Sequence, residues 1–540
     1  MQHPDAPHGF QGIFSSSDLA RALFAEGAGI FRILPAAVAV PADADDLVRL
    51  VSWAAATGTP LVPRAAGSGM PGGNVGGGVI VDMRRGFGGA PAIDPARRLA
   101  RAGAGVSYRD LNGAAAGYGL RLPPDPSSGA FCTVGGMVAT NAAGARSHRY
   151  GAMRPWVEQI GFVTAEGERG VAGTADPATT PATTAAERRL LADVAPYLRA
   201  HQRSLELAHR HTRKNSSGYE LTGGDDGWIR QLLIGSEGTL AFITDVVVRL
   251  APLPEEPTTL LLTLRSLDDV APAVAALDAL EPAAIELLDK TYLDFVRAAA
   301  QSRVPPETAA VLLVEFEGRP PDAERAVSGI AASMVFADTP EAASRLWELR
   351  HMASPILASL PDALRSLQVV EDGCVPLDRL SEYIGGLRRI AADTGFEIVI
   401  FGHAGDAHVH ANLLADVSAK DLAPRLSRVL AEASELQIAL GGTTSGEHGD
   451  GRLRAPYLER QFGPEYVDAC RRVKQAFDPA GILNPGVKLA AAGGSIDAAT
   501  LKVGAGAPAI PAQAAQALRE IERTAAYAAD RMDLLAGTGD

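Results

Sequence analysis

The first apolar pattern with a clear period lies in residues 44–56. Its apolar members fall on one face at helical spacing, and Gly58 follows where a helix would end. They are Leu47, Leu50, Val51, Ala54 and Ala55. Short apolar runs at residues 38–40, 61–62 and 79–83 predict strands on both sides of this helix. This order of elements predicts a βαβ unit.

The middle of the chain, residues 254–440, mixes strand-like and helical patterns. Apolar runs predict strands at residues 258–264, 311–316 and 396–401, and helical spacing predicts helices at residues 270–280 and 341–358. We expect these elements to form an antiparallel sheet with helices on one face.

Further helical patterns lie near both ends of the chain. They cover residues 18–25, 108–116, 463–477 and 512–536. The first belongs to an expected N-terminal arm, residues 1–34, and the last follows an Ala/Gly-rich linker. In the last pattern, Leu518, Ile521, Ala525, Met532 and Leu535 predict an added helix that packs on the body or on a partner.

Size and charge narrow the class of protein. The chain has 540 residues, more than one hydrophobic core usually serves, so we expect two or three domains. Apolar residues make up 47% of the chain, which is typical of a globular protein. The net charge is −13 and no basic stripe is present, so nucleic acid is not an expected partner.

Targeting signals and thiols bear on the compartment. Residues 1–8 have neither the basic nor the apolar part of a secretory signal, and no run reaches the roughly 18 apolar residues of a spanning helix. We therefore expect a cytoplasmic protein without transmembrane helices. Cys132, Cys374 and Cys470 are far apart in sequence, which suits a reducing compartment. Three thiols also cannot hold an iron–sulfur cluster alone, because that takes four grouped thiolates.

Three segments rich in small residues lie among these elements, at residues 64–78, 122–144 and 232–244. The first is a glycine-rich loop whose amides can wrap a diphosphate, although it matches neither G-x-G-x-x-G nor the Walker pattern. The second combines a proline-fixed turn with small residues that let a flat or phosphorylated ligand approach the backbone. The third has the composition of a turn between two strands. Each alone is compatible with a tight turn or a linker, but three together favour a ligand site.

Histidines and acids gather in residues 401–413 and 445–451. The members are His403, His408, His410, Glu447 and His448. Imidazole and carboxylate together suit a borderline cation such as zinc or manganese. In this interpretation the glycines beside them let the backbone approach a ligand closely.

Spacing alone leaves the ligand set open. In an extended segment His408 and His410 share a face, whereas His403 does not. A turn at residues 404–407 would bring His403 back to the same side. Any single histidine here is also compatible with a satisfied core position.

These residues together give the chain a resemblance to the flavin-linked dehydrogenases of the vanillyl-alcohol-oxidase type, in the branch of D-lactate, glycolate and D-2-hydroxyglutarate dehydrogenases. The resemblance runs from about residue 38 to residue 488. Its motifs correspond to Arg64–Gly73, Pro123–Gly151, Gly235–Leu240 and Asp478–Lys488. It implies a bound FAD and an α+β fold, in which a two-part PCMH-type FAD-binding domain is joined to a cap domain with an antiparallel sheet flanked by helices.

The resemblance also divides the chain. It implies an FAD-binding domain at residues 35–253, a substrate-binding cap at 254–440, and a segment at 441–490 that returns to the flavin. The N-terminal arm at 1–34 and the linker with its helix at 491–540 lie outside these parts.

Site residues follow from the same resemblance. It places FAD contacts at Arg64, Gly67, Ser68, Gly69, Gly72, Pro124, Asp125, Gly135, Gly136, Ala139, Thr140, Asn141, Gly144, Gly235, Glu237, Gly238, Ile243 and Asn484. It places a divalent metal, zinc or manganese, at His403, His410 and Glu447. His448 is the expected catalytic base, since an imidazole titrates near neutral pH, and Arg350 is the expected ligand of a substrate carboxylate.

The chain departs from the family pattern at three places. The usual Gly-Asp-Gly-Asn is here Gly405-Asp-Ala-His408, so an extra imidazole enters the site. The Arg-Gly-Gly of the first FAD loop is Arg64-Ala-Ala, which is acceptable only where those positions do not need a positive φ. Val370 stands where some members have a second, lysine ligand for the carboxylate.

We therefore expect a dehydrogenase that oxidises a small D-2-hydroxy acid to the 2-oxo acid. Electrons are expected to leave to an external acceptor, either a quinone, a flavoprotein or a separate iron–sulfur subunit, with the protein cytoplasmic or peripheral to the inner face of the membrane and able to form a homodimer. Three alternatives stay open: a flavin-free metal hydrolase, a flavin oxidase of another alcohol, and a subunit whose flavin only relays electrons.

Overall fold

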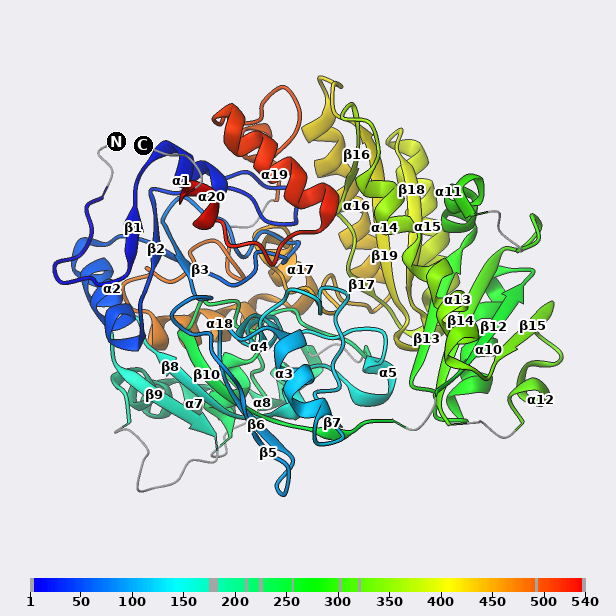
Figure 1. Ribbon diagram of the computed structural model, residues 1–540, viewed down its shortest axis with the longest axis horizontal. Coiled ribbons are helices and arrows are strands. Elements are labelled where there is room, and N and C mark those ends of the chain that lie inside the picture. Colours follow the sequence, from blue (N-terminus) through cyan, green and yellow to red (C-terminus); the bar gives the residue numbers. More distant parts are fainter. Residues whose placement is uncertain are drawn as a thin grey trace.

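The computed structural model describes residues 4–173, 183–208, 212–222, 227–254, 257–300, 304–318, 322–490 and 494–536. Residues 1–3 of the predicted arm, the start of the predicted linker at residues 491–493, and residues 537–540 after the predicted terminal helix lie outside the described residues. Figure 1 shows two lobes side by side, a first lobe mainly of blue, cyan and orange segments with the green strand β10, and a second of green and yellow segments.

A small sheet in the first lobe confirms the predicted βαβ unit. It has the order β1 (Ile13–Ser15), β2 (Ala37–Val40), β4 (Val79–Asp82), β3 (Leu61–Arg64), with β2 and β3 both parallel to β4 and β1 antiparallel to β2. The connecting helix is α2 (Ala44–Thr57). Asp43 caps its start by accepting from the amide of Asp46, and Gly58 ends it at φ 66°. Its predicted apolar face is buried at Leu47, Leu50, Val51 and Ala54.

The two termini of the chain cover the other face of this sheet. The helix α1 (Asp18–Leu23) and the C-terminal helix α19 (Ala512–Thr524) pack there, and Ala514 and Met532 share a core with Val38 and Ile80. The predicted terminal helix is shorter than expected, because Ala525 adopts φ 53° and only α20 (Asp533–Ala536) follows. The added helix therefore packs on the body of its own chain (Figure 1).

A five-stranded antiparallel sheet forms the rest of the first lobe. Its order is β5 (Ala92–Asp94), β6 (Leu99–Gly103), β10 (Phe242–Arg249), β8 (Val157–Val163), β9 (Arg169–Gly173). The strands β7 (Leu120–Arg121) and β11 (Ala251–Pro252) pair separately. The surrounding helices are α3 (Tyr108–Ala116), α4 (Val134–Thr140), α5 (Ser147–Tyr150), α6 (Ala185–Arg189), α7 (Ala195–Ala200), α8 (Gln202–Ala208), α9 (Trp228–Leu233), α17 (Leu458–Phe462) and α18 (Pro464–Phe477). The core of this lobe includes residues of α18, so the chain after the second lobe returns to the first.

The second lobe is built on one large antiparallel sheet. Its order is β15 (Ser333–Ala337), β12 (Pro257–Leu264), β14 (Ala310–Glu317), β13 (Ala284–Asp289), β18 (Glu397–His403), β19 (His408–Asp416), β16 (Leu364–Leu367), with β17 (Gly373–Cys374) also paired to β19. The prediction of an antiparallel sheet in this region is confirmed.

Helices cover both faces of this sheet, so the expectation of helices on one face is wrong. Alternate residues of β12 divide between two cores, with Leu260 and Leu262 on one face and Leu261 on the other. The first core includes α10 (Val270–Asp278), α12 (Ala323–Val327), α15 (Leu380–Asp393) and α16 (Leu422–Ala439). The second includes α11 (Lys290–Ala300), α13 (Pro340–His351) and α14 (Ala353–Ala358). Apolar side chains on both faces of the buried strands produce this arrangement.

The predicted α+β class, with an antiparallel sheet flanked by helices, is thus confirmed. Within the described part of the chain, no helix combines the length and the apolar character that crossing a bilayer requires.

Candidate functional site

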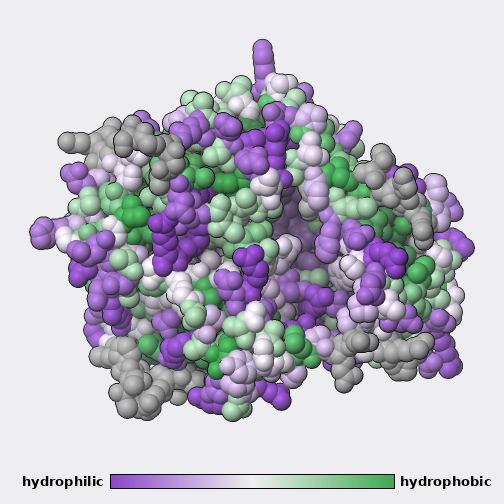
Figure 2. Space-filling model, viewed as in Figure 1, coloured by the Kyte–Doolittle hydropathy of each residue, from purple (hydrophilic) through white to green (hydrophobic). Residues whose placement is uncertain are grey.

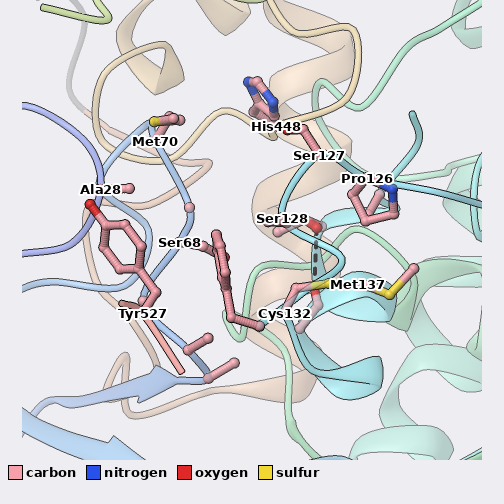
Figure 3. Close-up of a pocket in the computed structure, with 18 of the residues that line it drawn as sticks. Ala28, Ser68, Met70, Pro126, Ser127, Ser128, Cys132, Met137, His448 and Tyr527 are labelled. Carbon is pink, nitrogen blue, oxygen red and sulfur yellow. Dashed lines mark hydrogen bonds between the residues drawn. The ribbon is translucent and has the colours of Figure 1, made fainter. Parts of the chain in front are cut away.

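A cavity of about 840 Å³ lies where the two lobes meet, a size suited to a large ligand. Figure 2 shows the surface hollowed between the lobes. In Figure 3, Ser68 and Tyr527 lie across the cavity from Ser128 and Cys132, and His448 lies at one end. The three segments of small residues line the part of the cavity in the first lobe, and side chains of the second lobe line the rest.

The loop after β3 forms the first part of this wall. Gly67 has φ +77°, and a Cβ there would lie 2.3 Å from Nη2 of Arg64, so this position requires glycine. Arg64 donates to the backbone oxygens of Phe24, Glu26 and Asn74 at 3.2, 2.7 and 3.2 Å. Burial, together with nearby Arg531, lowers the pKa of Arg64 well below its usual value. Ala65 and Ala66 do not adopt a positive φ, so alanine can replace the family's glycines at these two positions.

The second segment builds the facing wall around α4. Thr133 caps this helix by accepting from the amide of Gly136 at 3.2 Å. A Cβ on Gly135 would lie 2.5 Å from the Cβ of Ala104. The glycine therefore lets α4 pack closely against Ala104, the residue that follows β6. The wall is therefore made of backbone and small side chains, which lets a flat or phosphorylated ligand lie against it.

The third segment joins helix α9 to strand β10, not two strands as predicted. Its turn uses positive φ values at Gly235, Glu237 and Gly238. The carboxylate of Glu237 accepts from the amides of Asp450 and Gly451 at 2.8 and 2.9 Å. The turn is thereby fastened to the segment that carries Glu447 and His448.

Most residues predicted to bind FAD line the cavity. These are Arg64, Gly67, Ser68, Gly69, Asp125, Gly135, Gly136, Ala139, Thr140, Glu237, Gly238 and Ile243. The remaining six are buried and are not among the lining residues: Gly72, Pro124, Asn141, Gly144, Gly235 and Asn484. Asn484, for example, donates to the backbone oxygens of Gly73 and Glu237 at 2.8 Å each, so it ties two of the segments together.

The hairpin of β18 and β19 brings the histidines together. His403 pairs directly with His408 across the hairpin, and a turn at residues 404–406 reverses the chain, as its sequence allowed. His410 lies two positions further on the same face of β19. Nε2 of His403 and Nε2 of His410 are 3.3 Å apart, and each lies 3.5 Å from Oε1 of Glu447.

This spacing fits a metal ion. Ligand atoms about 2.0–2.1 Å from a tetrahedral zinc stand about 3.3 Å apart. Nδ1 of His410 donates to the backbone oxygen of Glu371 at 2.7 Å, and Nδ1 of His403 pairs with the carboxylate of Glu286. Both outer nitrogens are therefore engaged, which leaves the Nε2 lone pairs directed at Glu447. The residues that would hold a metal are thus in place.

Four partners that sequence reasoning missed organise this cluster. Lys214 donates to Oε2 of Glu447 at 2.8 Å and lies 3.4 Å from Asp406. Burial alone would raise the pKa of Glu447, but Lys214 and His403 hold it well below its ordinary value. Asp372 accepts from the amides of Glu447 and His448 at 3.0 Å each. The other two partners are Glu286, which pairs with His403, and Glu371, which pairs with His448. The one signal in the sequence was a charged residue within or beside an apolar run.

His448 faces the cavity with one nitrogen and is held by the other. Its Nδ1 pairs with Glu371, whose other oxygen accepts from the buried Arg454. Its Nε2 lies 3.4 Å from Oε1 of Glu447, and 26% of the side chain is exposed. Burial lowers its pKa, but Glu371 and Asp372 outweigh this and raise the pKa well above the ordinary value. The exposed Nε2 is therefore the atom that a ligand can reach.

Arg350 reaches the same cavity from α13. Its Nε donates to Oε2 of Glu286 at 2.8 Å, and its guanidinium lies 4.5 Å from the ring centroid of Phe401. Glu286 therefore links Arg350, which is predicted to bind the substrate carboxylate, to the predicted metal ligand His403. Val370 is buried.

The C-terminal segment is an unexpected part of the wall. Thr524, Ala525 and Tyr527 line the cavity, and the Tyr527 ring lies 5.4 Å from that of Phe131. Glu522 at the rim accepts from Lys502 at 3.0 Å and pairs with Arg365 of β16. Neither the composition nor the period of this segment points to a ligand site.

The cysteines take no part in a cluster. Cys132, Cys374 and Cys470 are each buried and free. Burial raises the pKa of the Cys374 and Cys470 thiols to about 12.

Two family models match parts of the chain. Residues 35–172 match a family model described as FAD binding domain, and residues 253–487 match one described as FAD linked oxidases, C-terminal domain. Both matches end before the C-terminal segment that contributes to the cavity.

Several characterised proteins are similar over most of the chain. The glycolate oxidase subunit GlcD of Bacillus subtilis is 32% identical over 468 residues, which cover 84% of this chain and 89% of that protein. The D-lactate dehydrogenase of Archaeoglobus fulgidus is 31% identical, with 83% and 90% covered. The D-2-hydroxyglutarate dehydrogenase of Pseudomonas putida is 29% identical, with 88% of this chain and 50% of that protein covered. The solved structure of an alkyldihydroxyacetonephosphate synthase shares the fold at a TM-score of 0.58 and 16% identity, covering 87% of this chain and 82% of that one.

Proposed function

The chain belongs to the FAD-linked oxidases related to D-lactate, glycolate and D-2-hydroxyglutarate dehydrogenases, and on this premise we propose that it oxidises a D-2-hydroxy acid to the 2-oxo acid. One observation carries the proposal. The cavity lined by the small-residue segments also receives Nε2 of His448, the cluster of His403, His410 and Glu447, and Arg350. A flat cofactor and a small acid would therefore meet in one place.

The division of the chain fits this proposal. We assign residues 35–253 and 441–490 to the FAD-binding part and residues 254–440 to the cap that holds the substrate. The returning segment contains both Glu447 and His448, and its α18 is packed in the core of the first lobe. The site would then form between the two lobes.

His448 would act as the base. Glu371 holds Nδ1, so the neutral form of the ring presents Nε2 to the substrate hydroxyl and takes its proton. Because Glu371 and Asp372 raise the pKa of His448, this neutral form becomes more populated as the pH rises. Glu371 and Arg454 keep the ring oriented, and Glu371 stabilises the positive charge that the ring gains. A bound FAD would supply the hydride acceptor, and a divalent metal held by His403, His410 and Glu447 would supply a Lewis acid. The alcohol loses one proton and one hydride, which gives the 2-oxo acid.

Arg350 would hold the substrate carboxylate. Its Nε is engaged by Glu286, and a planar guanidinium still has further N–H donors directed elsewhere. A fork of this kind matches the two oxygens of a carboxylate. A carboxylate at Arg350 and a hydroxyl near His448 define a 2-hydroxy acid as the substrate class.

Electrons would leave to an external acceptor. The only three thiols in the sequence are buried and unpaired in the structure, and an iron–sulfur cluster needs four grouped thiolates. A quinone, a flavoprotein or a separate iron–sulfur subunit would therefore complete the turnover. A flavin-free hydrolase is disfavoured, because it leaves the small-residue wall and both family matches without a role.

The test is anaerobic reduction of the purified yellow protein by a panel of D- and L-2-hydroxy acids, with and without a chelator. The proposal expects bleaching of the flavin by one or more D-acids and slower bleaching after chelation. Bleaching by simple alcohols without a carboxylate would instead favour an oxidase of another alcohol. A folded, colourless protein that binds zinc would favour the hydrolase.

A further inference from the structure

The third imidazole of the hairpin, His408, has no role in the function proposed above. It pairs with His403 across the hairpin and lies two residues before His410 on β19, and its side chain is completely buried. Its ring centroid lies 4.7 Å from that of His410 and 5.4 Å from that of His403. The backbone of Gly446 packs closely against the ring, since a Cβ on Gly446 would lie 2.6 Å from Cδ2 of His408.

The surroundings fix which nitrogen carries the proton. Nε2 of His408 lies 2.9 Å from Oδ1 of Asp372. The same carboxylate accepts from the amides of Glu447 and His448 and from the hydroxyl of Ser445 at 2.7 Å. Asp372 is therefore an acceptor on all sides, so His408 must donate from Nε2. Its Nδ1 is left with a lone pair.

That lone pair has no hydrogen-bond donor. Among the described residues Nδ1 of His408 makes no hydrogen bond, although it is fully buried. The facing atom is Oε2 of Glu447 at 4.0 Å, which is an acceptor as well. Oε2 of Glu447 already accepts from Lys214 at 2.8 Å, so the His408 lone pair is the acceptor that lacks a partner. A buried acceptor without a partner costs about 1–3 kcal/mol, and a metal cation beside Glu447 would satisfy it.

We propose that Nδ1 of His408 is a fourth protein ligand of the metal, so that the centre has three imidazoles and one carboxylate. This inference rests on the metal site of the proposed function and specifies it. The ligand atoms of His403, His408, His410 and Glu447 all lie within 4.8 Å of one another. Ligands on opposite sides of one ion at about 2.1–2.3 Å are about 4.2–4.6 Å apart, so small shifts bring all four to one centre.

A fourth ligand changes which metal the site suits. Four protein ligands fill a tetrahedral zinc ion and leave no position for the substrate hydroxyl. The substrate then needs an ion that accepts five or six ligands, such as manganese, iron or cobalt, or a zinc ion that expands to five. Three imidazoles also favour metals late in the first-row series over magnesium or calcium.

The first experiment counts ligands in the unaltered protein. Full-length, FAD-loaded protein is stripped with a chelator, reloaded with Co²⁺, and examined by X-ray absorption, which the flavin does not obscure. The inference expects scattering from three imidazoles and the pre-edge intensity of a five- or six-coordinate ion. Scattering from two imidazoles would overturn it.

The second experiment uses His408→Asn, which restores the family's residue at this position, with His351→Asn as the matched control. His351 lines the cavity but lies outside the cluster. Competition with a coloured chelator should show Co²⁺ affinity at least about tenfold weaker in His408→Asn and unchanged in His351→Asn. Flavin absorbance and far-UV circular dichroism should match the wild type in both, which shows that the fold is intact.

Two failures are distinguishable. Wild-type affinity and scattering in His408→Asn would overturn the fourth ligand alone and leave the proposed metal at His403, His410 and Glu447. A wild-type protein that takes up no metal would overturn the metal part of the proposed function together with this inference.

Discussion

Glu522 offers a quantitative test of how the C-terminal segment is held against the cavity. Its side chain is 25% exposed and receives Lys502 and Arg519 at 3.0 and 3.1 Å, besides its pair with Arg365 on the cap sheet. Burial alone would raise its pKa, but Lys502 and Arg365 lower the pKa of Glu522 to about 2. The carboxylate thus joins α19 to both the linker and the second lobe.

The magnitude follows from this shift. A pKa lowered from the ordinary 4.5 to about 2 corresponds to about 3 kcal/mol in favour of the docked, ionised form. Because the folded pKa is depressed, this contribution is complete above the unfolded value and is lost as the pH falls through about 2. At pH 3 about 1.4 kcal/mol should remain.

The perturbation is Glu522→Gln, with Glu520→Gln on the exposed side of the same helix as the control. Hydrogen exchange of the α19 amides should show local opening easier by about 3 kcal/mol at pH 7 in Glu522→Gln, with little change in Glu520→Gln. The difference between Glu522→Gln and wild type should shrink toward pH 3. Equal exchange in the two proteins at pH 7, or a difference that grows with acid, would refute the electrostatic explanation.

Four other outcomes follow from the site. His448→Asn should retain FAD and metal but slow anaerobic flavin reduction at least about a hundredfold, and unchanged reduction would remove His448 as the base. Glu286→Gln should weaken metal binding about 10- to 100-fold and raise KM, since it frees both His403 and Arg350, whereas exposed Glu281→Gln should do neither. Tyr527→Ala should raise the FAD dissociation constant several-fold through the lost contact with Phe131, about 0.5–1.5 kcal/mol, and unaltered FAD affinity would place the ring outside the cofactor site. Chelation should leave the flavin spectrum intact but slow its reduction, and equal rates before and after would count against a metal at the hydroxyl.

Local periodicity predicted much of the fold. The α2 pattern worked because one wide apolar face, an Asp cap and a following glycine all specify the same helix, and α3 was predicted for residues 108–116 as found. Helix α4 was not predicted, because its Gly-Gly-rich sequence has low helix propensity and is stabilised by the Thr133 cap and by packing. The single long C-terminal helix was wrong because Ala525 takes a left-handed conformation that tertiary contacts impose.

Spacing in the chain pointed to the histidine cluster, whereas Arg350, Glu447 and His448 were given their roles beside it through the family resemblance. His403, His408 and His410 lie within eight positions of the chain, and the turn at residues 404–406 places His403 opposite His408. Glu286, Lys214, Glu371 and Asp372 come from distant segments and reach the cluster only through the sheet and the lobe contact. An isolated buried carboxylate or lysine has no sequence signature, and the charges that stabilise it become visible only in three dimensions.

The most direct test of the whole account is a single anaerobic turnover of the FAD-loaded, metal-loaded protein with a D-2-hydroxy acid, in which flavin absorbance and 2-oxo acid are measured in the same sample. The account predicts one 2-oxo acid formed for each flavin reduced. Bound flavin that dithionite reduces but no 2-hydroxy acid reduces would contradict it.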